Sequence, residues 1–408
     1  MIGSRLEPAE LDAAQSLCQH TLSQDWREGV CASDQVKFAY TRPSPRHYPW
    51  QWYWDSCFAA IAWRRFDPYR PEAELRSLLA AQQPDGFIGH TIFWTGQPRD
   101  IRRFTYNVLS RSARMTASIQ PPALAWSWRI SVGDPSLEPG IAAHHNWLAE
   151  HRDLDGDGLI WIVQPDESGL DASPQFDPIW GRRSHGLPGF LGLVHRNRRL
   201  GYDLAKVEAA GGPVCCEVMT NVLYGLSRLA LGEPSLTATI VERMYDEATG
   251  VFWPLARPAP QAPIPLTWTA LSPLALPDLP EEIGRRLVEE YLLDPARFWL
   301  PVPVPSVAAD ERSFSLRDTR FGIHRYWRGP SWVNAAWLLW LGLRRLGYDE
   351  HAGELARRVV GAMLASGLRE YYDPYTGRGM GARSFAWSAL AVELADPDPA
   401  AASSYLTL

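Results

Sequence analysis

The segment SWVNAAWLLWLGLRRLG, residues 331–347, indicates the fold class of this chain. Its apolar residues recur at i, i+3, i+4 and i+7, which is the spacing of one face of an α-helix. Pro330 lies close to the expected start, and Gly347 stands where a helix commonly ends on a glycine. The segment is therefore predicted to be a helix.

Helical periodicity recurs along the chain in further segments of about 10–18 residues. They are 71–83, 137–152, 215–231, 281–293, 351–367 and 384–395. Strand signals are thin: VFWPL at 251–255 is a candidate for a short hairpin, and Cys215-Cys216 is read as part of a helix. We therefore predict an all-α protein whose helices are joined by long loops that hold most of the tryptophans.

No change of composition marks a domain boundary in the 408 residues. The Pro-rich stretch 256–280 is the most linker-like, but its Leu and Trp residues indicate that it packs on the surface of one domain. We therefore expect a single domain over residues 1–408. Many helices in one domain of this size favour a helical toroid or barrel, with function in loops at one end, over a four-helix bundle.

Composition and charge limit the partners of the protein. Apolar residues make up 46% of the chain and charged residues 21%, which is ordinary globular usage. The net charge is −6 without a basic block, which argues against nucleic acid or an anionic membrane as a partner. No run of about 18 apolar residues predicts a membrane span. Five cysteines without a CxxC pair, and an N-terminus without an apolar signal segment, predict a cytoplasmic protein with reduced thiols.

The stretch YPWQWYWDSCF, residues 48–58, concentrates aromatic rings beside one carboxylate, in a chain with 19 tryptophans. Tryptophan is a poor core filler because its indole N–H needs a partner when it is buried. In one interpretation, Asp55 or Ser56 caps a helix that runs to about Phe66. In the other, the rings, among them Trp50 and Trp54, stack on a sugar while Asp55 accepts hydrogen bonds from its hydroxyls. Both interpretations can hold together.

A second stretch, QPDESGLDASPQFDPIWG at 164–181, is rich in carboxylates and turn residues. Such loops are more often solvated than catalytic, and Asp166, Glu167 and Asp177 fit that interpretation. Asp171, however, is flanked by apolar residues. Apolar surroundings raise the pKa of a carboxyl group, which a general acid near neutral pH requires.

Two further stretches combine rings with charged residues. In LREYYDPYTGRGMGARSFAWSA, 368–389, Glu370 follows a predicted helix end and precedes a glycine-rich turn, so it is either part of a helix terminus or a carboxylate that faces a ligand. In FGIHRYWRGPSWVNAAW, 321–337, the aromatic theme returns, and Arg325 and Arg328 are candidates to contact an anionic or polyhydroxyl group.

Motifs for other chemistries are missing from the sequence. It has no GxxxxGK[ST] or GxGxxG for phosphates, no HExxH or Cys/His array for zinc, and no GxSxG for an acyl-transfer serine. His144-His145 is interpreted as a structural pair. The stretch 151–160 begins like a calcium loop, but Gln164 replaces its last acidic ligand, which favours a simple turn. Two separate loops with carboxylates and a set of aromatic rings remain. A pair of carboxyl groups is what glycoside hydrolysis requires.

Four motifs in order, WYWDSCF, GLDASPQFD, YWRGPSW and EYYDPYTGRGMGARSFAWSA, resemble glycoside hydrolase family 63. The similarity is greatest to its short bacterial members, which hydrolyse mannosylglycerate or glucosylglycerate, and it runs from about residue 47 to about residue 390. This resemblance implies an (α/α)6 barrel, a toroid of six helical hairpins with its active site in aromatic-rich loops. It also implies hydrolysis of α-glycosides with inversion.

Site residues follow from the resemblance. Asp171 takes the place of the family's general acid, in G-[LW]-D-x-S-P, and Glu370 that of its general base, before Y-D-P-x-T-G. An inverting pair of carboxyl groups stands about 6.5–9.5 Å apart so that a water fits between. This chemistry needs no metal or organic cofactor, and the implied partner is a small carbohydrate. The residues implied to line the sugar site are Trp54, Asp55, Tyr326, Trp327 and Trp332, with Gln83, His90, Trp94 and Gln120 as further candidates. Arg328, proposed above from its charge, is also counted among the substrate-binding residues.

Some alternatives stay open at this point. The polar segment that holds glycerate in the glycerate-type members is not recognisable around 211–221, so the aglycone is open, as are gluco or manno configuration and the oligomeric state. One rival is an α-glucosidase or trehalase-like enzyme on a neutral sugar, which would not need Arg325 or Arg328. Another is a non-catalytic carbohydrate-binding protein, which would not need both Asp171 and Glu370. A helical-toroid polysaccharide lyase is disfavoured because it would require a basic cleft.

Overall fold

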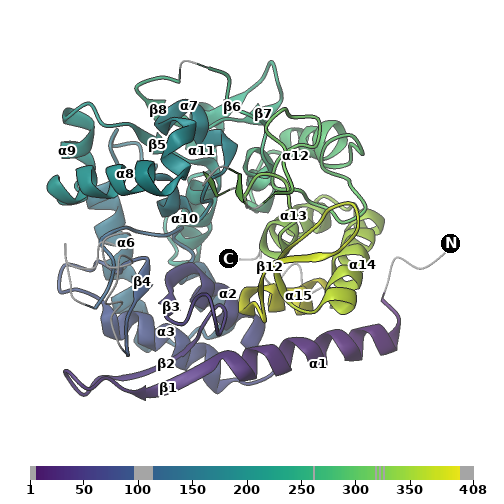
Figure 1. The fold of residues 1–408 in the computed structure, drawn as a ribbon, viewed down its shortest axis with the longest axis horizontal. Coiled ribbons are helices and arrows are strands. Elements are labelled where there is room, and N and C mark those ends of the chain that lie inside the picture. The colour runs from purple at the N-terminus through teal and green to yellow at the C-terminus, as the bar shows by residue number, and fades with distance from the viewer. Residues whose placement is uncertain are drawn as a thin grey trace.

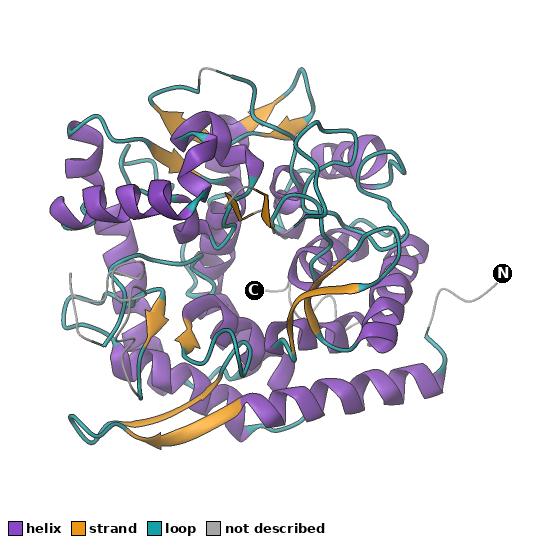
Figure 2. Cartoon of the chain, in the orientation of Figure 1, coloured by secondary structure: helices purple, strands orange, loops and turns teal. Residues whose placement is uncertain are grey.

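Helices dominate the computed structural model, with short antiparallel strand pairs between them (Figure 1, Figure 2). The structure describes residues 6–95, 114–260, 262–317, 319–320, 323–324 and 327–395. The α-helices are α1 Pro8–Asp25, α2 Tyr53–Trp63, α3 Tyr69–Ala81, α5 Leu124–Ser131, α6 Glu138–Arg152, α7 Asp177–Trp180, α8 Leu187–Arg199, α9 Leu204–Ala209, α10 Val218–Ala230, α11 Thr237–Met244, α12 Glu281–Leu287, α13 Val333–Arg345, α14 Asp349–Ser366 and α15 Ala391–Ala395.

The remaining elements are short. The 3-10 segments are η1 Pro135–Leu137, η2 Pro165–Ser168, η3 Pro174–Phe176, η4 Arg182–His185, η5 Trp268–Ala275 and η7 Ala386–Leu390, and η6 Val288–Leu292 is a π-helix. The strand pairs are β1 Trp26–Val30 with β2 Lys37–Thr41, β3 Gln51–Trp52 with β4 Thr91–Ile92, β5 Val214–Cys216 with β8 Leu255–Arg257, β6 Tyr245–Asp246 with β7 Val251–Phe252, β9 Thr319–Arg320 with β10 Ile323–His324, and β11 Arg369–Tyr372 with β12 Gly379–Arg383.

Two of the longer helices, α2 and α13, lie largely inside the molecule. Every residue of α2 is buried, and α13 is buried from Val333 to Leu343. A helix that is apolar on all sides is expected in an interior position. Accordingly, α2 packs against α3, α5 and η7, and α13 packs against η5, α14 and η7.

The inner elements pack in a closed order. Contacts run from α2 to α5, α10, η5, α13 and η7, and from η7 back to α2. A second helix packs on each of these elements: α3 on α2, α6 on α5, α11 on α10, α12 on η5, α14 on α13 and α1 on η7. Figure 1 shows the helices placed around the middle of the molecule in this order. The prediction of a mainly helical protein is therefore confirmed.

Two local predictions were wrong. Cys215 and Cys216 lie on strand β5, where the backbone of Cys215 exchanges two hydrogen bonds with Ile162, and α10 begins only after Glu217, whose side chain caps it. The helix expected to start at Asp55 or Ser56 starts at Tyr53, because its first N–H groups find tertiary partners in place of a capping side chain. The hairpin expected at VFWPL is present as β6–β7.

The acidic loop that resembles a calcium site is engaged by protein groups. Asp153 accepts hydrogen bonds from two backbone N–H groups of its own loop. Asp155 and Asp157 both pair with Arg243, at 2.9 and 2.8 Å, and Asp155 also pairs with Arg257. These contacts agree with the prediction of a turn.

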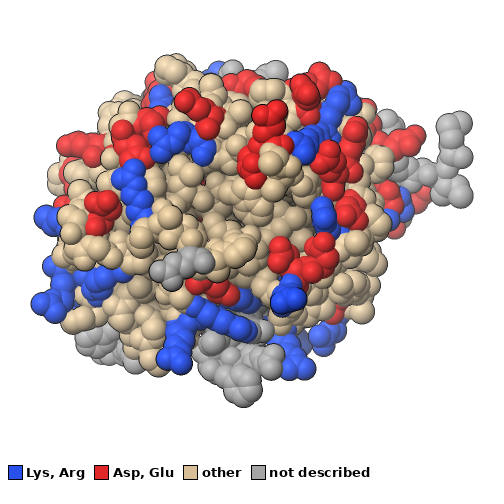
Figure 3. Space-filling model, turned by 90° about the horizontal axis from the view of Figure 1, so that it is seen from above, with Lys and Arg blue, Asp and Glu red and all other residues tan. Residues whose placement is uncertain are grey.

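Surface charge is mixed in sign. On the face shown in Figure 3, acidic and basic side chains alternate around a largely uncharged central area. This distribution fits the modest net charge of −6. Among the described ranges, we find no helix with the length and apolar character needed to cross a membrane.

Candidate active site

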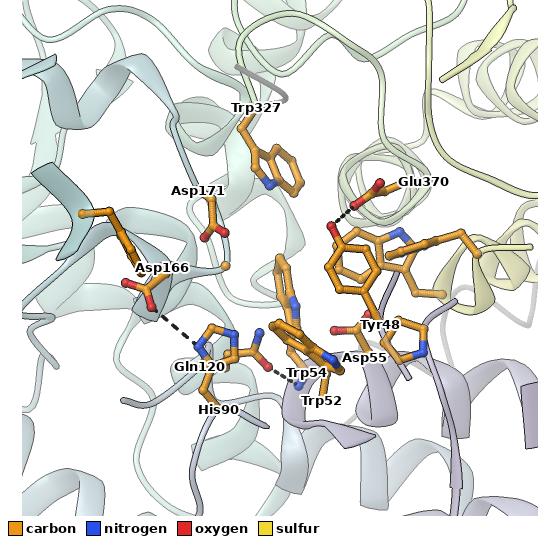
Figure 4. A pocket seen from close by; sticks show the side chains of 15 residues that line it. Tyr48, Trp52, Trp54, Asp55, His90, Gln120, Asp166, Asp171, Trp327 and Glu370 are labelled. Atoms are coloured by element: carbon orange, nitrogen blue, oxygen red, sulfur yellow. Dashed lines mark hydrogen bonds and ion pairs between the residues drawn. The ribbon is translucent and has the colours of Figure 1, made fainter. Parts of the chain in front are cut away.

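A pocket with a volume of about 210 Å³ brings rings and carboxyl groups together from distant parts of the chain (Figure 4). Its lining consists of Pro43, Tyr48, Trp52, Trp54, Asp55, His90, Gln120, Asp166, Gly169, Asp171, Phe190, Trp327, Glu370, Phe385 and Trp387. These residues lie in β3, α2, η2, α8, β11, η7 and the loops between these elements. The pocket therefore depends on the closed packing order of the helices.

A buried ion pair anchors the loop that carries Asp171. Glu167 and Arg152 form two hydrogen bonds, of 2.7 and 2.8 Å, and both side chains are almost inaccessible. Glu167 also accepts hydrogen bonds from the N–H groups of Ile119 and Val163. Because an unpaired buried charge is costly, this pair holds η2, and thereby the start of the Asp171 loop, in place.

A glycine allows this loop to approach the aromatic wall. Gly169 has a φ of +69°, a region that L side chains rarely adopt. A Cβ at this position would lie 2.5 Å from the ring of Trp54. Glycine therefore lets the backbone pass against Trp54 two residues before Asp171.

Glu370 is held by direct hydrogen bonds on the opposite side of the pocket. It lies on β11, is 6% exposed, and accepts a hydrogen bond of 3.1 Å from the Tyr48 hydroxyl and one of 2.8 Å from the N–H of Ala382. A Cβ on Gly381 would lie 2.6 Å from its Oε2. Two donors on one carboxyl group suit an ionised carboxylate, which can only accept.

Asp55 lies beside Glu370 in the first turn of α2. Burial, followed by the charge of Glu370, raises the pKa of Asp55 well above its ordinary value. A protonated carboxyl group can both donate and accept a hydrogen bond. Asp55 is thus equipped to bind a hydroxyl group next to Glu370.

Tryptophans form the aromatic wall between the two carboxyl groups. Trp327 and Trp332 stack in parallel, with ring centroids 3.7 Å apart. Trp387 meets Trp54 edge to face at 4.9 Å, and Trp54 lies 6.5 Å from Trp327. The wall presents flat apolar faces with few rotatable bonds, which suits stacking on the C–H face of a sugar.

Polar groups occupy the part of the pocket near Asp171. Gln120 accepts a hydrogen bond from the N–H of Trp54 at 3.0 Å. His90 lies with Nδ1 3.9 Å from Asp166, and burial lowers the pKa of His90 to about 3, which keeps it neutral. Burial, followed by the charge of Asp171, raises the pKa of Asp166 well above its ordinary value. In the part of the chain that the structure describes, no group of three His, Cys, Asp or Glu side chains is placed to hold a metal ion.

Comparison with known proteins identifies the family. The model of the "Mannosylglycerate hydrolase MGH1-like glycoside hydrolase domain" matches residues 48–233 and 232–388. The chain belongs to this family. A mannosylglycerate hydrolase of Thermus thermophilus is 32% identical over 86% of this chain and 95% of its own length. A glucosylglycerate hydrolase of Mycolicibacterium hassiacum is 26% identical over 86% of this chain and 93% of its own length.

A solved structure extends the similarity to three dimensions. The family 63 mannosylglycerate hydrolase of Thermus thermophilus, in complex with Tris and D-glycerate, has a TM-score of 0.75 and 28% identity. The match covers 93% of this chain and 99% of that one. The resemblance inferred from the four motifs is therefore confirmed, and this MGH1-like glycoside hydrolase is a glycosidase.

In the MGH1-like hydrolase, many of the predicted site residues meet in the pocket. Those that line it are Trp54, Asp55, His90, Gln120, Asp171, Trp327 and Glu370. Trp332 stands behind Trp327 rather than in the lining. Tyr326 and Arg325 lie outside the described residues.

Other predicted residues are engaged elsewhere. Trp50 packs edge to face on Phe93, with ring centroids 5.0 Å apart. Trp94 donates its indole N–H to Gln51, and with Gln83 it borders a different pocket of about 730 Å³. Arg328, which was expected to contact the substrate, has a protein partner.

Arg328 is buried and forms a two-point ion pair with Asp177, one of whose hydrogen bonds is 2.9 Å long. His185 approaches the same carboxylate at 2.9 Å. The pair joins the segment of Trp327 to the loop of Asp171. Arg328 therefore lies outside the pocket lining and connects two of the walls of the pocket.

Several lining residues were not among the predicted site residues. They are Pro43, Tyr48, Trp52, Asp166, Gly169, Phe190, Phe385 and Trp387. Most of them stand within the four motifs or beside them, so the motif boundaries were the available signal. Phe190 lies on α8, outside every motif, and the sequence offers no sign of its place in the pocket.

Proposed function

We propose that this glycosidase hydrolyses a small α-glycoside of glycerate, either α-mannosylglycerate or α-glucosylglycerate, with inversion at the anomeric carbon. The names of its relatives support the substrate class. The observation that carries the proposal is the placement of Asp171, on a loop, and Glu370, on strand β11, which face one pocket (Figure 4). Both are needed for an inverting mechanism.

In the proposed mechanism, Asp171 is the general acid. It gives its proton to the glycosidic oxygen as the bond from this oxygen to the anomeric carbon breaks, so that the leaving group departs neutral at that atom. Glu370 is the general base. It takes a proton from the water whose oxygen attacks the opposite face of the anomeric carbon, so one water is consumed for each bond cleaved.

The remaining lining residues bind and orient the sugar. Trp54, Trp327 and Trp387 exclude water and stack on the ring, and Asp55 binds a hydroxyl beside Glu370. Fixed orientation lowers the entropy cost of bringing water, sugar and the two carboxyl groups together. Within this proposal, the reaction requires no metal or organic cofactor.

We further propose that the closed packing order forms the inner ring of a single (α/α)6-barrel domain. The support is that α2, α5, α10, η5, α13 and η7 contact one another in sequence and that each is covered by a second helix. One buried hydrophobic cluster extends from Ala14 to Ala395, which supports one domain.

Nuclear magnetic resonance of the first-formed sugar tests the mechanism. We expect turnover of α-glucosylglycerate or α-mannosylglycerate to release the β-anomer before mutarotation. Release of the α-anomer would indicate a covalent intermediate and would overturn the assigned roles. Absence of turnover of both substrates would overturn the substrate class.

A further inference from the structure

Asp166 is one of the polar residues in the part of the pocket near Asp171. It lies on η2, lines the pocket, and is 8% exposed. Its Oδ2 accepts a hydrogen bond of 2.9 Å from the side chain of Gln164. Among the described residues, its Oδ1 has no hydrogen-bond partner although it is buried. The protein thus leaves hydrogen-bonding capacity on a carboxyl group that lines the pocket, since each carboxyl oxygen can accept two hydrogen bonds and Oδ2 accepts one from Gln164.

The Asp166 side chain is held in position by a chain of amides. Gln164 donates to Asp166 and accepts a hydrogen bond of 2.8 Å from Asn197 on α8. Asn197 is fully buried and also donates to the carbonyl of Val163. Asp166 is therefore preorganised, as a recognition group must be to limit the ordering cost of binding.

His90 faces Asp166 at a distance that leaves room for a third atom. Nδ1 of His90 and Oδ2 of Asp166 are 3.9 Å apart, which is too long for a hydrogen bond. An oxygen placed between them can lie about 2.8 Å from each. The edge of Trp52 packs against His90, with ring centroids 5.0 Å apart, and fixes the imidazole. A hydroxyl group both donates and accepts, so it can donate to Asp166 and accept from His90.

The position of Asp166 in the pocket indicates which hydroxyl it meets. It lies five residues before Asp171 on the same loop, on the side of the pocket away from Asp55 and Glu370 (Figure 4). In the proposed function, Asp171 reaches the glycosidic oxygen. The hydroxyl groups closest to that oxygen are the 2-hydroxyl of the sugar and the free hydroxyl of the leaving group.

We propose that Asp166, with His90, is a specificity-determining residue that binds a substrate hydroxyl adjacent to the glycosidic oxygen. The inference rests on the proposed function and names a recognition element within it. A site built to hydrogen-bond a hydroxyl rejects an analogue that lacks it, because the buried groups of the protein are then left unpaired. If the 2-hydroxyl is bound, Asp166 chooses between gluco and manno substrates, which differ in the direction of that group.

Binding of small probes to the full chain tests the inference without turnover. The sugar probes are glucose, mannose and 2-deoxyglucose, and the leaving-group probes are D-glycerate and D-lactate, which lacks the 3-hydroxyl. Dissociation constants are measured by isothermal titration for the wild type, for Asp166→Leu, and for Asp166→Asn, which retains a polar group. Asp246→Asn, at the end of β6, makes the same chemical change away from the pocket and serves as control.

We expect the wild type and the control to bind one hydroxylated probe at least about tenfold more tightly than its deoxy partner, as for discrimination by a hydrogen bond. In Asp166→Leu, the ratio of the dissociation constants of the deoxy and hydroxylated probes falls close to one. In Asp166→Asn, this ratio lies between the values for Asp166→Leu and the wild type. A change in the glucose or mannose ratio assigns the 2-hydroxyl, and a change in the glycerate ratio assigns the leaving group.

The inference is overturned if both ratios are the same in the wild type and in the variants, or if the wild type binds none of the probes. If Asp166→Leu loses its fold by circular dichroism, the comparison of Asp166→Asn with Asp246→Asn decides. Failure of the proposed function gives a different pattern, in which glycerate glycosides are not hydrolysed while the sugar ratio still depends on Asp166.

Discussion

The loop of Asp171 and the hairpin of Glu370 place their carboxyl groups by different means. Glu370 sits on a strand, and its two oxygens accept hydrogen bonds from Tyr48 and Ala382. The loop of Asp171 is anchored by a neighbouring residue, Glu167, through its buried pair with Arg152. The hairpin thus contacts the carboxylate of Glu370 directly, and the loop of Asp171 is anchored four residues before Asp171 through the side chain of Glu167. We therefore expect substitutions on the two sides of the pocket to differ in the size of their effects.

The two carboxyl variants give the largest expected effect. Asp171→Asn and Glu370→Gln should each lower kcat on the glycerate glycoside by about 10²–10⁴-fold, the usual contribution of acid–base catalysis. With an α-glycosyl fluoride, whose leaving group needs no proton, Asp171→Asn should regain most of its activity and Glu370→Gln should not. Steady-state kinetics on both substrates measures this. Equal losses on the fluoride would contradict the division into acid and base.

The buried pair beneath the Asp171 loop gives the next effect. Arg152→Met leaves Glu167 buried and unpaired, which should lower the free energy of unfolding by about 3–5 kcal/mol. The matched control is Arg76→Met, because Arg76 pairs with Glu72 at the surface and should contribute only about 0.2–1 kcal/mol. Urea unfolding compares the two. Similar small losses in both variants would show that the pair does not fix the loop.

On the Glu370 side of the pocket, helix α2 packs against the buried carboxyl group of Glu74. Glu74 is fully buried next to α2, where Ser56 donates to it at 2.6 Å, and burial raises the pKa of Glu74 from 4.5 to about 8. Between these two pH values the folded protein keeps a proton that the unfolded chain has lost. Stability should therefore fall as pH rises through this window.

Replacing Glu74 tests this pH dependence. The wild type should lose a few kcal/mol of unfolding free energy between about pH 5 and pH 8. Glu74→Gln should not show this loss, so its plot of stability against pH should be flatter. Urea unfolding at several pH values, with the wild type in parallel, measures the slope. An unchanged slope in Glu74→Gln would mean that other groups cause it.

The smallest expected effect concerns the orientation of Glu370. Tyr48→Phe removes one donor to an ionised carboxylate, for which about 1.5–3 kcal/mol is typical. This corresponds to a loss in kcat/KM of roughly 10- to 150-fold. Tyr69→Phe, at an exposed position, serves as control and should leave kcat/KM unchanged. A loss above about 1,000-fold would show that Tyr48 takes part in the reaction rather than in positioning.

The sequence allowed a good prediction of the elements that depend on local pattern. The helix at 331–347 was readable because its periodicity, its preceding proline and its terminal glycine agree, and α13 lies at Val333–Arg345. Strand β5 was missed because Cys215 gains its extended partners from Ile162, far away in the sequence. The start of α2 was misplaced for a similar reason, since Gln120 supplies a partner for its first turn.

Site residues could be predicted from the sequence where they belong to a recognisable motif. They could not be predicted where their role depends on burial in the folded chain. Asp171 and Glu370 stand in recognisable motifs. Asp166 and Glu167 are adjacent carboxylates in the sequence, and the folded chain places Asp166 in the pocket lining and Glu167 in an ion pair with Arg152. Arg328 has the charge expected of a ligand-binding residue, but its distant partner Asp177 places it in a structural pair. Trp50 shares the composition of its neighbours, yet it packs on Phe93.

The closed packing order has a consequence for synthesis of the chain. The first lining residue is Pro43 and the last is Trp387, and η7 must reach α2 before the pocket is enclosed. Contacts between such distant segments form slowly compared with local ones. A nascent chain in which η7 has not yet emerged from the ribosome therefore has no complete binding pocket. Activity should appear only after η7 has packed against α2.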